Sequence, residues 1–161
     1  MDELMESLRE RFTQMQNRMI AAMNQLDNED LNWRPGKESN SIANLVIHIS
    51  GNVHQRIESG IEGKIDTRDR EAEFDQDVYY EKEELIDIIS KSFSKIIKVI
   101  SNLSTEDLLK MQTIRSQKVT NFEVLMRCAT HFSEHLGQIL YIAKMRTKDT
   151  YVSTSIPRKN D

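Results

Sequence analysis

Apolar residues recur along four stretches of the chain at spacings of three and four residues, which is the period of one face of an α-helix. We therefore predict four helices, near residues 3–26, 41–59, 81–102 and 121–145. Long helices with one apolar face are typical of an all-α four-helix bundle, and we expect no sheet to contribute to its core. The periodic positions are Leu4, Leu8, Phe12, Met15, Met19 and Met23 in the first stretch, Ile42, Leu45, Val46, Ile49, Val53 and Ile57 in the second, Leu85, Ile88, Ile89, Phe93, Ile96, Ile97 and Ile100 in the third, and Leu125, Ala129, Phe132, Leu136 and Ile139 in the fourth.

Turn and capping residues separate these helices. Residues 27–37 include Asn, Pro and Gly and predict a turn after the first helix. Either Asn40 or Ser41 can cap the second helix by accepting a hydrogen bond from a free backbone amide. Thr120 and Glu123 predict a capping box for the fourth helix, in which the hydroxyl and the carboxylate each accept from an amide.

The stretch from residue 60 to residue 79 is charged and shows no period. It is too long for an ordinary connection between neighbouring helices, so it is a long crossover, a functional loop or a partly structured segment. The chain length of 161 residues is enough for one core. We assign residues 1–146 to one helical-bundle domain and residues 147–161 to its C-terminal tail.

One short internal similarity concerns the architecture. Residues 26–31 read LDNEDL and follow the first helix, whereas residues 103–108 read LSTEDL and follow the third. The match arises either by chance or from a duplicated helical hairpin. Duplication would make the second and fourth helices structural equivalents.

Charge and cysteine content narrow the class of function. The chain has 22 basic and 26 acidic residues, a net charge of −4, and no cluster of Lys or Arg dominates a predicted helix. Nucleic acid is therefore a poor partner. The opening residues are charged and the longest apolar run is short, so we expect neither a signal peptide nor a membrane span. A single cysteine, Cys128, cannot form an internal disulfide and fits a cytoplasmic protein. We interpret Cys128 as a small buried hydrophobe and not as a nucleophile.

Three histidines border the apolar faces of two predicted helices. His131 and His135 are four residues apart, so their rings point the same way from one helix. His48 lies in the most hydrophobic stretch of the second helix. A buried neutral imidazole needs partners for a donor and an acceptor, and a divalent metal ion shared by all three rings would supply a common one. The alternative is that each is an ordinary core or surface histidine.

Other polar residues on these helices are weaker ligand candidates. His54 follows His48 by six residues and is rotated by about 120°, which places it on the surface or at the rim. Glu123 belongs to the helix cap, and Glu134 lies on the outer face. Gln138 is better placed to orient the ring of His135 than to bind metal. Three imidazoles without a fourth protein ligand would leave one coordination position open.

Residues 41–48 (SIANLVIH) and 131–139 (HFSEHLGQI) together resemble the DinB-like (YfiT-like) family of metal-binding four-helix bundles. The family's hallmark is one histidine on the second helix and a His-x-x-x-His-x-Gly-Gln stretch on the fourth. The turn at 31–35 and the charged segment at 68–74 are also similar. The resemblance implies a long crossover between the second and third helices, a metal site at the three histidines and, commonly, a homodimer.

Two classes of function follow. The first is a metal-dependent enzyme, of thiol transferase or hydrolase type, that activates a water or a small thiol at the open position. Arg68, Arg70 and Arg127 are then candidates for binding a cosubstrate, although each could be an ordinary surface charge. The second is a non-catalytic, metal-stabilised dimeric bundle. We expect zinc or nickel as the metal, since imidazole suits both.

Overall fold

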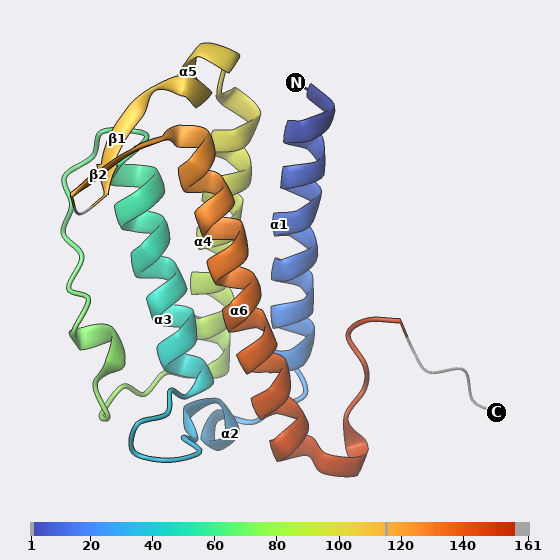
Figure 1. The fold of residues 1–161 in the computed structure, drawn as a ribbon. Helices are drawn as coiled ribbons and strands as arrows, with labels where there is room; N and C mark the ends of the chain where they lie inside the picture. Colours follow the sequence, from blue (N-terminus) through green and yellow to red (C-terminus); the bar gives the residue numbers. More distant parts are fainter. Residues whose placement is uncertain (1, 115, 157–161) are drawn as a thin grey trace.

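The computed structural model describes residues 2–114 and 116–156 (Figure 1). Its helices lie close to the predicted ranges, with two further one-turn helices and a short hairpin between them. The elements are α1 (Asp2–Met23), α2 (Asn28–Asn32), α3 (Ile42–Val53), a π-helical continuation (His54–Ser59), a 3₁₀ turn (Ala72–Phe74), α4 (Lys82–Asn102), α5 (Thr105–Leu109), β1 (Met111–Ile114), β2 (Gln117–Thr120), α6 (Asn121–Thr147) and a second 3₁₀ turn (Lys148–Thr150).

The four long helices form the predicted bundle with one long crossover. Helices α1 and α3 each pack against both α4 and α6, so α1 and α3 occupy opposite corners. Figure 1 shows α1 and α6 running one way and α3 and α4 the other. Because α3 and α4 are parallel, residues 60–79 must return along the length of the bundle, and they do so along the outside of α3 (Figure 1). The long charged segment is therefore the crossover, with the 3₁₀ turn within it.

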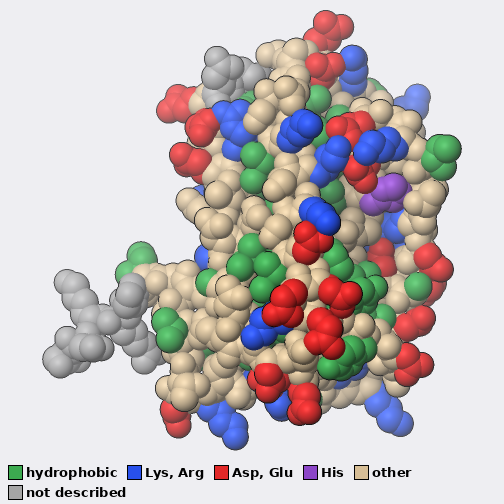
Figure 2. All heavy atoms as spheres, turned by 180° about the vertical axis from the view of Figure 1, so that it is seen from behind, with side chains coloured by type: hydrophobic (Ala, Val, Ile, Leu, Met, Phe, Trp, Pro, Cys, Tyr) green, Lys and Arg blue, Asp and Glu red, His purple; other side chains and the backbone are tan. Residues whose placement is uncertain are grey.

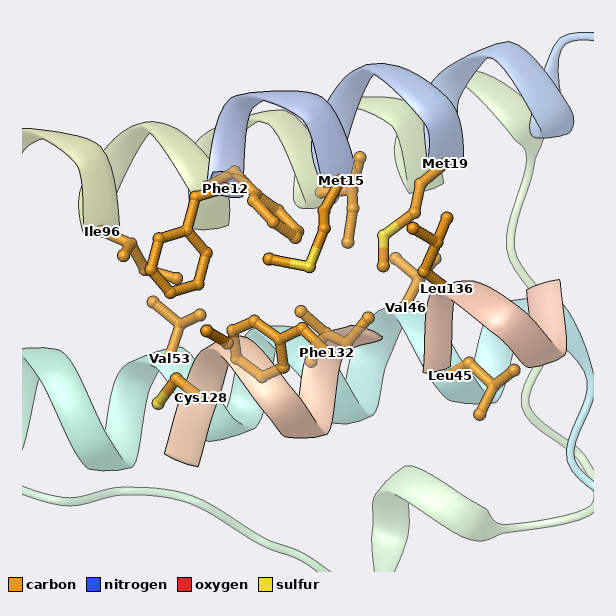
Figure 3. Packing of buried hydrophobic residues seen from close by; sticks show 14 of the residues in the cluster. Phe12, Met15, Met19, Leu45, Val46, Val53, Ile96, Cys128, Phe132 and Leu136 are labelled. Carbon is orange, nitrogen blue, oxygen red and sulfur yellow. The ribbon is translucent and has the colours of Figure 1, made fainter. Parts of the chain in front are cut away.

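The core is built around three phenylalanines from three helices. Phe12 of α1 meets Phe93 of α4 and Phe132 of α6 edge-on, with ring centroids 6.2 and 6.3 Å apart, and Phe93 lies 5.9 Å from Phe132. All three side chains are fully buried. Figure 3 shows Phe12, Met15 and Met19 pointing from α1 toward Phe132 and Leu136 of α6. Such aromatic contacts add to the large apolar area that each ring buries.

The two similar hexapeptides adopt the same local structure. Asp27 accepts from the amide of Asp30 and begins α2, and Ser104 accepts from the amide of Asp107 and begins α5. Each turn buries its leucine, Leu31 in α2 and Leu108 in α5. The periodicity analysis missed these helices because one turn is too short to show a period. The same capping pattern accounts for both turns, and the repeated hairpin stays a hypothesis.

The expectation that no sheet contributes to the core is wrong. Strands β1 and β2 pair antiparallel, with Ile114 opposite Gln117 and Met111 opposite Thr120. The side chains of Ile114 and Val119 are buried in the core. Strands of four residues give too short an alternation for detection in the sequence.

The caps are partly as predicted. Ser41 caps α3 in a capping box with Asn44, which agrees with one of the two predicted positions. Thr120 caps α6 by accepting from the amide of Glu123. The Glu123 carboxylate instead accepts from Arg127 (Nη2 to Oε1, 2.6 Å), so the second half of the predicted box is wrong. A charged donor one turn along the helix has displaced the neutral amide as its partner.

The predicted C-terminal tail begins within the last turn of α6. Gln25, just after α1, exchanges two hydrogen bonds with the backbone of Val152, at 2.7 and 3.0 Å. These bonds hold the described part of the tail against the end of α1. Residues 157–161 of the predicted tail lie outside the described residues.

The described surface carries both signs of charge. Figure 2 shows acidic and basic side chains interspersed over one face of the molecule, without a continuous basic area on that face. Among the described residues, no helix is long and apolar enough to cross a membrane.

Candidate metal centre

The structure brings together the three predicted ligand residues. His48 projects from α3, and His131 and His135 project from the neighbouring α6. Nε2 of His131 lies 3.0 Å from Nε2 of His48 and 3.1 Å from Nε2 of His135. A ligand nitrogen from each ring lies within 4.8 Å of the other two. The rings therefore converge on one point between the two helices.

The local sequence explains why the rings converge. His131 and His135 are separated by one helical turn, while the intervening Phe132 faces the core and is fully buried. His48 lies between the core residues Ile49 and Val46 on α3 and is itself 5% exposed. Packing of the apolar stripes of α3 and α6 consequently brings the histidines at their edges together.

His48 has a partner that the sequence analysis missed. Oε2 of Glu73, from the 3₁₀ turn of the crossover, lies 2.9 Å from Nδ1 of His48. The carboxylate also accepts from Arg68, at 2.7 Å from Nε and 2.8 Å from Nη2. Nη2 of Arg68 also lies 3.3 Å from Nδ1 of His48, but it already donates to Oε2 of Glu73 at the shorter distance of 2.8 Å. A carboxylate paired with a guanidinium group accepts, so the proton of His48 lies on Nδ1, and Nε2 offers a lone pair to the site.

Gln138 contacts the ring of His135. Its Oε1 is 2.8 Å from Nδ1 of His135, one turn earlier on α6. An amide oxygen at this position accepts the Nδ1 proton, which leaves Nε2 of His135 as an acceptor. Outer partners of this kind fix the tautomer and the ring orientation of histidines that bind metal.

The three rings offer more acceptors than donors at their meeting point. Nε2 of His48 and Nε2 of His135 are both acceptors, and His131 between them can donate one proton to one of them at a time. A metal ion would satisfy all three lone pairs. The two short separations, 3.0 and 3.1 Å, are close to the roughly 3.4 Å expected between two nitrogens of a tetrahedral zinc site. The donor set therefore fits a divalent ion.

Burial keeps the rings in the form that binds metal. Loss of hydration lowers the pKa of His48 to about 4, although its hydrogen bond to Glu73 acts in the opposite direction. The same loss of hydration, followed by the charge of His135, lowers the pKa of His131. Both rings are therefore neutral at pH 7, as ligation requires.

A cavity of about 890 Å³ opens beside the histidines. Its walls come from α3, its π-helical continuation, the crossover, the hairpin and α6. The missed hairpin thus forms one wall of the candidate site. The residues that line the cavity are Asn40, His48, Asn52, Gln55, Arg56, Ser59, Gly60, Asp66, Arg68, Arg70, Phe74, Gln112, Thr113, Ile114, Val124, Arg127, Cys128, His131 and His135.

Three residues that the sequence analysis rejects as ligands, His54, Glu134 and Glu123, lie outside the histidine cluster. His54 is held by Glu58 (Nδ1 to Oε2, 2.9 Å) and accepts from the amide of Thr67 at 3.1 Å. The side chain of Glu134 is 75% exposed, and its Oε2 lies 3.8 Å from Nδ1 of His131, beyond hydrogen-bonding distance. Glu123 pairs with Arg127.

Comparison with known proteins places the fold. Residues 1–160 match a family described as proteins of unknown function, DUF1572. The chain belongs to this family. No curated protein matches the sequence.

Two solved DinB-like structures resemble this DUF1572 chain. One, from Bacillus cereus ATCC 10987, has 16% sequence identity and a TM-score of 0.69, with coverage of 88% of this chain and 91% of that one. The other, YjoA from Bacillus subtilis, has 17% identity and a TM-score of 0.69, with coverage of 92% and 97%. At these identities the likeness establishes the fold alone.

The three arginines singled out in this DUF1572 sequence have different surroundings. The side chain of Arg68 is 4% exposed and is engaged by Glu73 and by Gln55 (Nη1 to Oε1, 2.9 Å). Its positive charge is therefore already paired with a carboxylate of the protein. Arg70 stacks over the ring of Phe74 at 5.1 Å and is half exposed, as is Arg127. These two line the cavity with part of their surface open to solvent.

Cys128 is buried in this DUF1572 chain, and burial raises the pKa of its thiol to about 12. At pH 8 only about one thiol in 10⁴ is then ionised, so we expect alkylation by iodoacetamide to be at least about 100-fold slower than in the urea-unfolded chain. Mass spectrometry can follow the reaction without ambiguity, since the chain has one cysteine. Equal rates in the two states would show an accessible thiol and revive Cys128 as a nucleophile.

Proposed function

We propose that this protein binds one divalent metal ion through His48, His131 and His135 and uses the open coordination position to activate a water or a small thiol. The observation that carries the proposal is the convergence of three ring nitrogens within 4.8 Å of one another at the wall of a large cavity. A structural site is usually closed by four protein ligands, whereas a catalytic site keeps a position for water or substrate.

The roles of the residues follow from their contacts. The three imidazoles would hold the ion, Glu73 and Gln138 would orient two of the rings, and the cavity would admit the substrate. When bound, a divalent ion lowers the pKa of a coordinated water or thiol and so supplies a nucleophile near neutral pH. Zinc and nickel are the proposed metals because neutral imidazole suits both.

The cavity favours a substrate with an acidic group. Arg70 and Arg127 stand on its lining and are half exposed, and Asp66 is the one carboxylate among the lining residues that the structure describes. Arg70 and Arg127 are paired with Glu71 and Glu123, but both pairs are exposed to solvent, where such pairs contribute little, so a carboxylate on the cosubstrate could compete for either guanidinium group. A thiol transferase with an acidic thiol fits this lining, and a hydrolase of an acidic substrate is the other reaction we propose.

A non-catalytic role is the second candidate. A metal ion at the cluster would tie α3 to α6, which lie side by side in the bundle, and would stabilise the fold without any reaction. In that case we propose that the protein acts as a metal-stabilised homodimer. Sedimentation of the metal-loaded protein measures the oligomeric state directly.

Cobalt substitution separates the two candidates. We expect the metal-free protein to bind one Co²⁺ per chain, and azide or a small thiol to change the visible spectrum of the bound ion. His54→Ala should give the same response, since His54 is engaged with Glu58 and Thr67 outside the cluster. A spectrum indifferent to every added anion and thiol would mean a closed site and would favour the structural role.

A responsive site should then be tested for the reaction. Metal-dependent conjugation of a small electrophile with physiological thiols would identify a transferase, and metal-dependent release of product without a thiol would identify a hydrolase. The charge-reversed variant Arg127→Glu serves as the test of substrate charge. It should raise the KM for an acidic substrate with little change for a neutral one.

A further inference from the structure

The crossover carries a buried carboxylate into the bundle. Glu73 is 5% exposed at its side chain, and its backbone oxygen accepts from Nδ2 of Asn44 at 2.9 Å. Arg34 donates to the backbone oxygen of the next residue, Phe74, at 3.3 Å. The 3₁₀ turn is thus fastened on both sides, so the carboxylate reaches His48 from a fixed position.

A glycine makes room for this carboxylate. Gly51 lies inside α3, three residues after His48, where glycine is less favourable than alanine. A methyl group at Gly51 would overlap Oε1 of Glu73 and would lie 2.9 Å from its Cδ and 3.1 Å from Nε of Arg68. The carboxylate and guanidinium groups therefore lie directly against the bare backbone of the helix.

Arg68 compensates the charge of the buried Glu73 carboxylate. Its two hydrogen bonds to Glu73 form a fork, and Oε2 still accepts the Nδ1 proton of His48. One positive and one negative charge are buried together, so neither is left uncompensated. Paired with Arg68 in this way, Glu73 holds the His48 proton on Nδ1.

We infer that Glu73 is a positioning residue for the proposed metal site, and that it reaches His48 only because position 51 is glycine. The inference rests on the proposed function for its effect on metal binding. The geometry alone supports its effect on the His48 ring. A carboxylate behind a ligating histidine fixes the tautomer and raises the basicity of the ring, and loss of such a partner typically costs 10- to 100-fold in metal affinity.

The metal-free protein tests the positioning first. Two-bond ¹H–¹⁵N correlations of the histidine rings should show His48 as the Nδ1–H tautomer in the wild type. Gly51→Ala should displace Glu73 and turn this signal into a mixture of tautomers. A wild-type His48 that carries its proton on Nε2 would overturn the inference.

Cobalt binding tests the consequence. Gly51→Ala should weaken Co²⁺ binding by about 10- to 100-fold and shift the visible bands of the remaining complex. Gly137→Ala is the matched control, because Gly137 lies in α6 beside the other ligands and a methyl group there would meet no atom within 4 Å. Equal affinity and identical spectra for the two variants would overturn the inference.

A second variant covers the case in which Gly51→Ala does not fold, as judged by circular dichroism. Arg68→Met/Glu73→Leu removes both buried charges together, which proteins often tolerate, and it leaves His48 without its acceptor. It should show the same loss of Co²⁺ affinity. A wild type with the Nδ1–H tautomer that binds no cobalt would refute the proposed function and leave the positioning of His48 in place.

Discussion

Replacing His131 by alanine is expected to reduce the affinity for Co²⁺ or Zn²⁺ by more than about 100-fold. His131 stands between the other two rings, and its Nε2 is within 3.1 Å of both neighbouring nitrogens. Loss of an outer partner already costs 10- to 100-fold, so the loss of one of three direct ligands should cost more. His48→Ala and His135→Ala should have effects of the same order, measured by competition with a chromogenic chelator.

His54→Ala is the control for these variants. His54 is bonded to Glu58 and Thr67 and takes no part in the cluster, so its removal should leave the affinity within about twofold of the wild type. Each protein should keep its helical circular dichroism. If all four variants lost affinity equally, the assignment of ligands by helix face would be wrong.

Phe93→Ala is expected to give the largest loss of stability, about 3–5 kcal/mol in the free energy of unfolding. The ring is fully buried on α4 and contacts both Phe12 and Phe132, and the cavity left behind would face three helices. Chemical denaturation of the metal-free protein measures the loss directly. For a chain of this length it corresponds to a melting temperature lower by about 6–20 °C.

Two controls show whether the loss of stability comes from the packing of Phe93. Leu109→Ala removes a leucine that is 66% exposed and should change stability by less than about 0.5 kcal/mol. The metal affinity of folded Phe93→Ala should stay close to that of the wild type, because Phe93 belongs to α4 and the ligands to α3 and α6. A loss below about 1 kcal/mol would contradict the described packing of the three rings.

The long helices could be predicted because their information is local. A period of three to four apolar residues over 20 positions specifies both the helix and its buried face, and the spacing of His131 and His135 fixes the common direction of their rings. The same reasoning set His54 apart from His48. Elements of one turn or four residues leave no such period, so α2, α5 and the hairpin were not predicted.

The contact between Glu73 and His48 could not be predicted from the local sequence. It lies 25 residues after His48 in a charged stretch without periodicity, and nothing in the neighbouring sequence distinguishes it from Glu71. This carboxylate reaches the ring for three reasons that only the folded chain shows. The crossover returns along α3, Asn44 binds its backbone, and Gly51 leaves room beside the helix. A glycine inside a helix was the one signal of close approach that the sequence held.

The four long helices, their apolar faces and the three histidines at the edges of those faces could be predicted, since each is set by spacing along one helix. Three features are visible only in the folded chain: the edges of α3 and α6 meet, the hairpin forms a wall of the cavity, and Arg68 pairs with Glu73. These contacts join residues far apart in the chain. They depend on the packing of whole helices and on the compensation of buried charge, which no local pattern records.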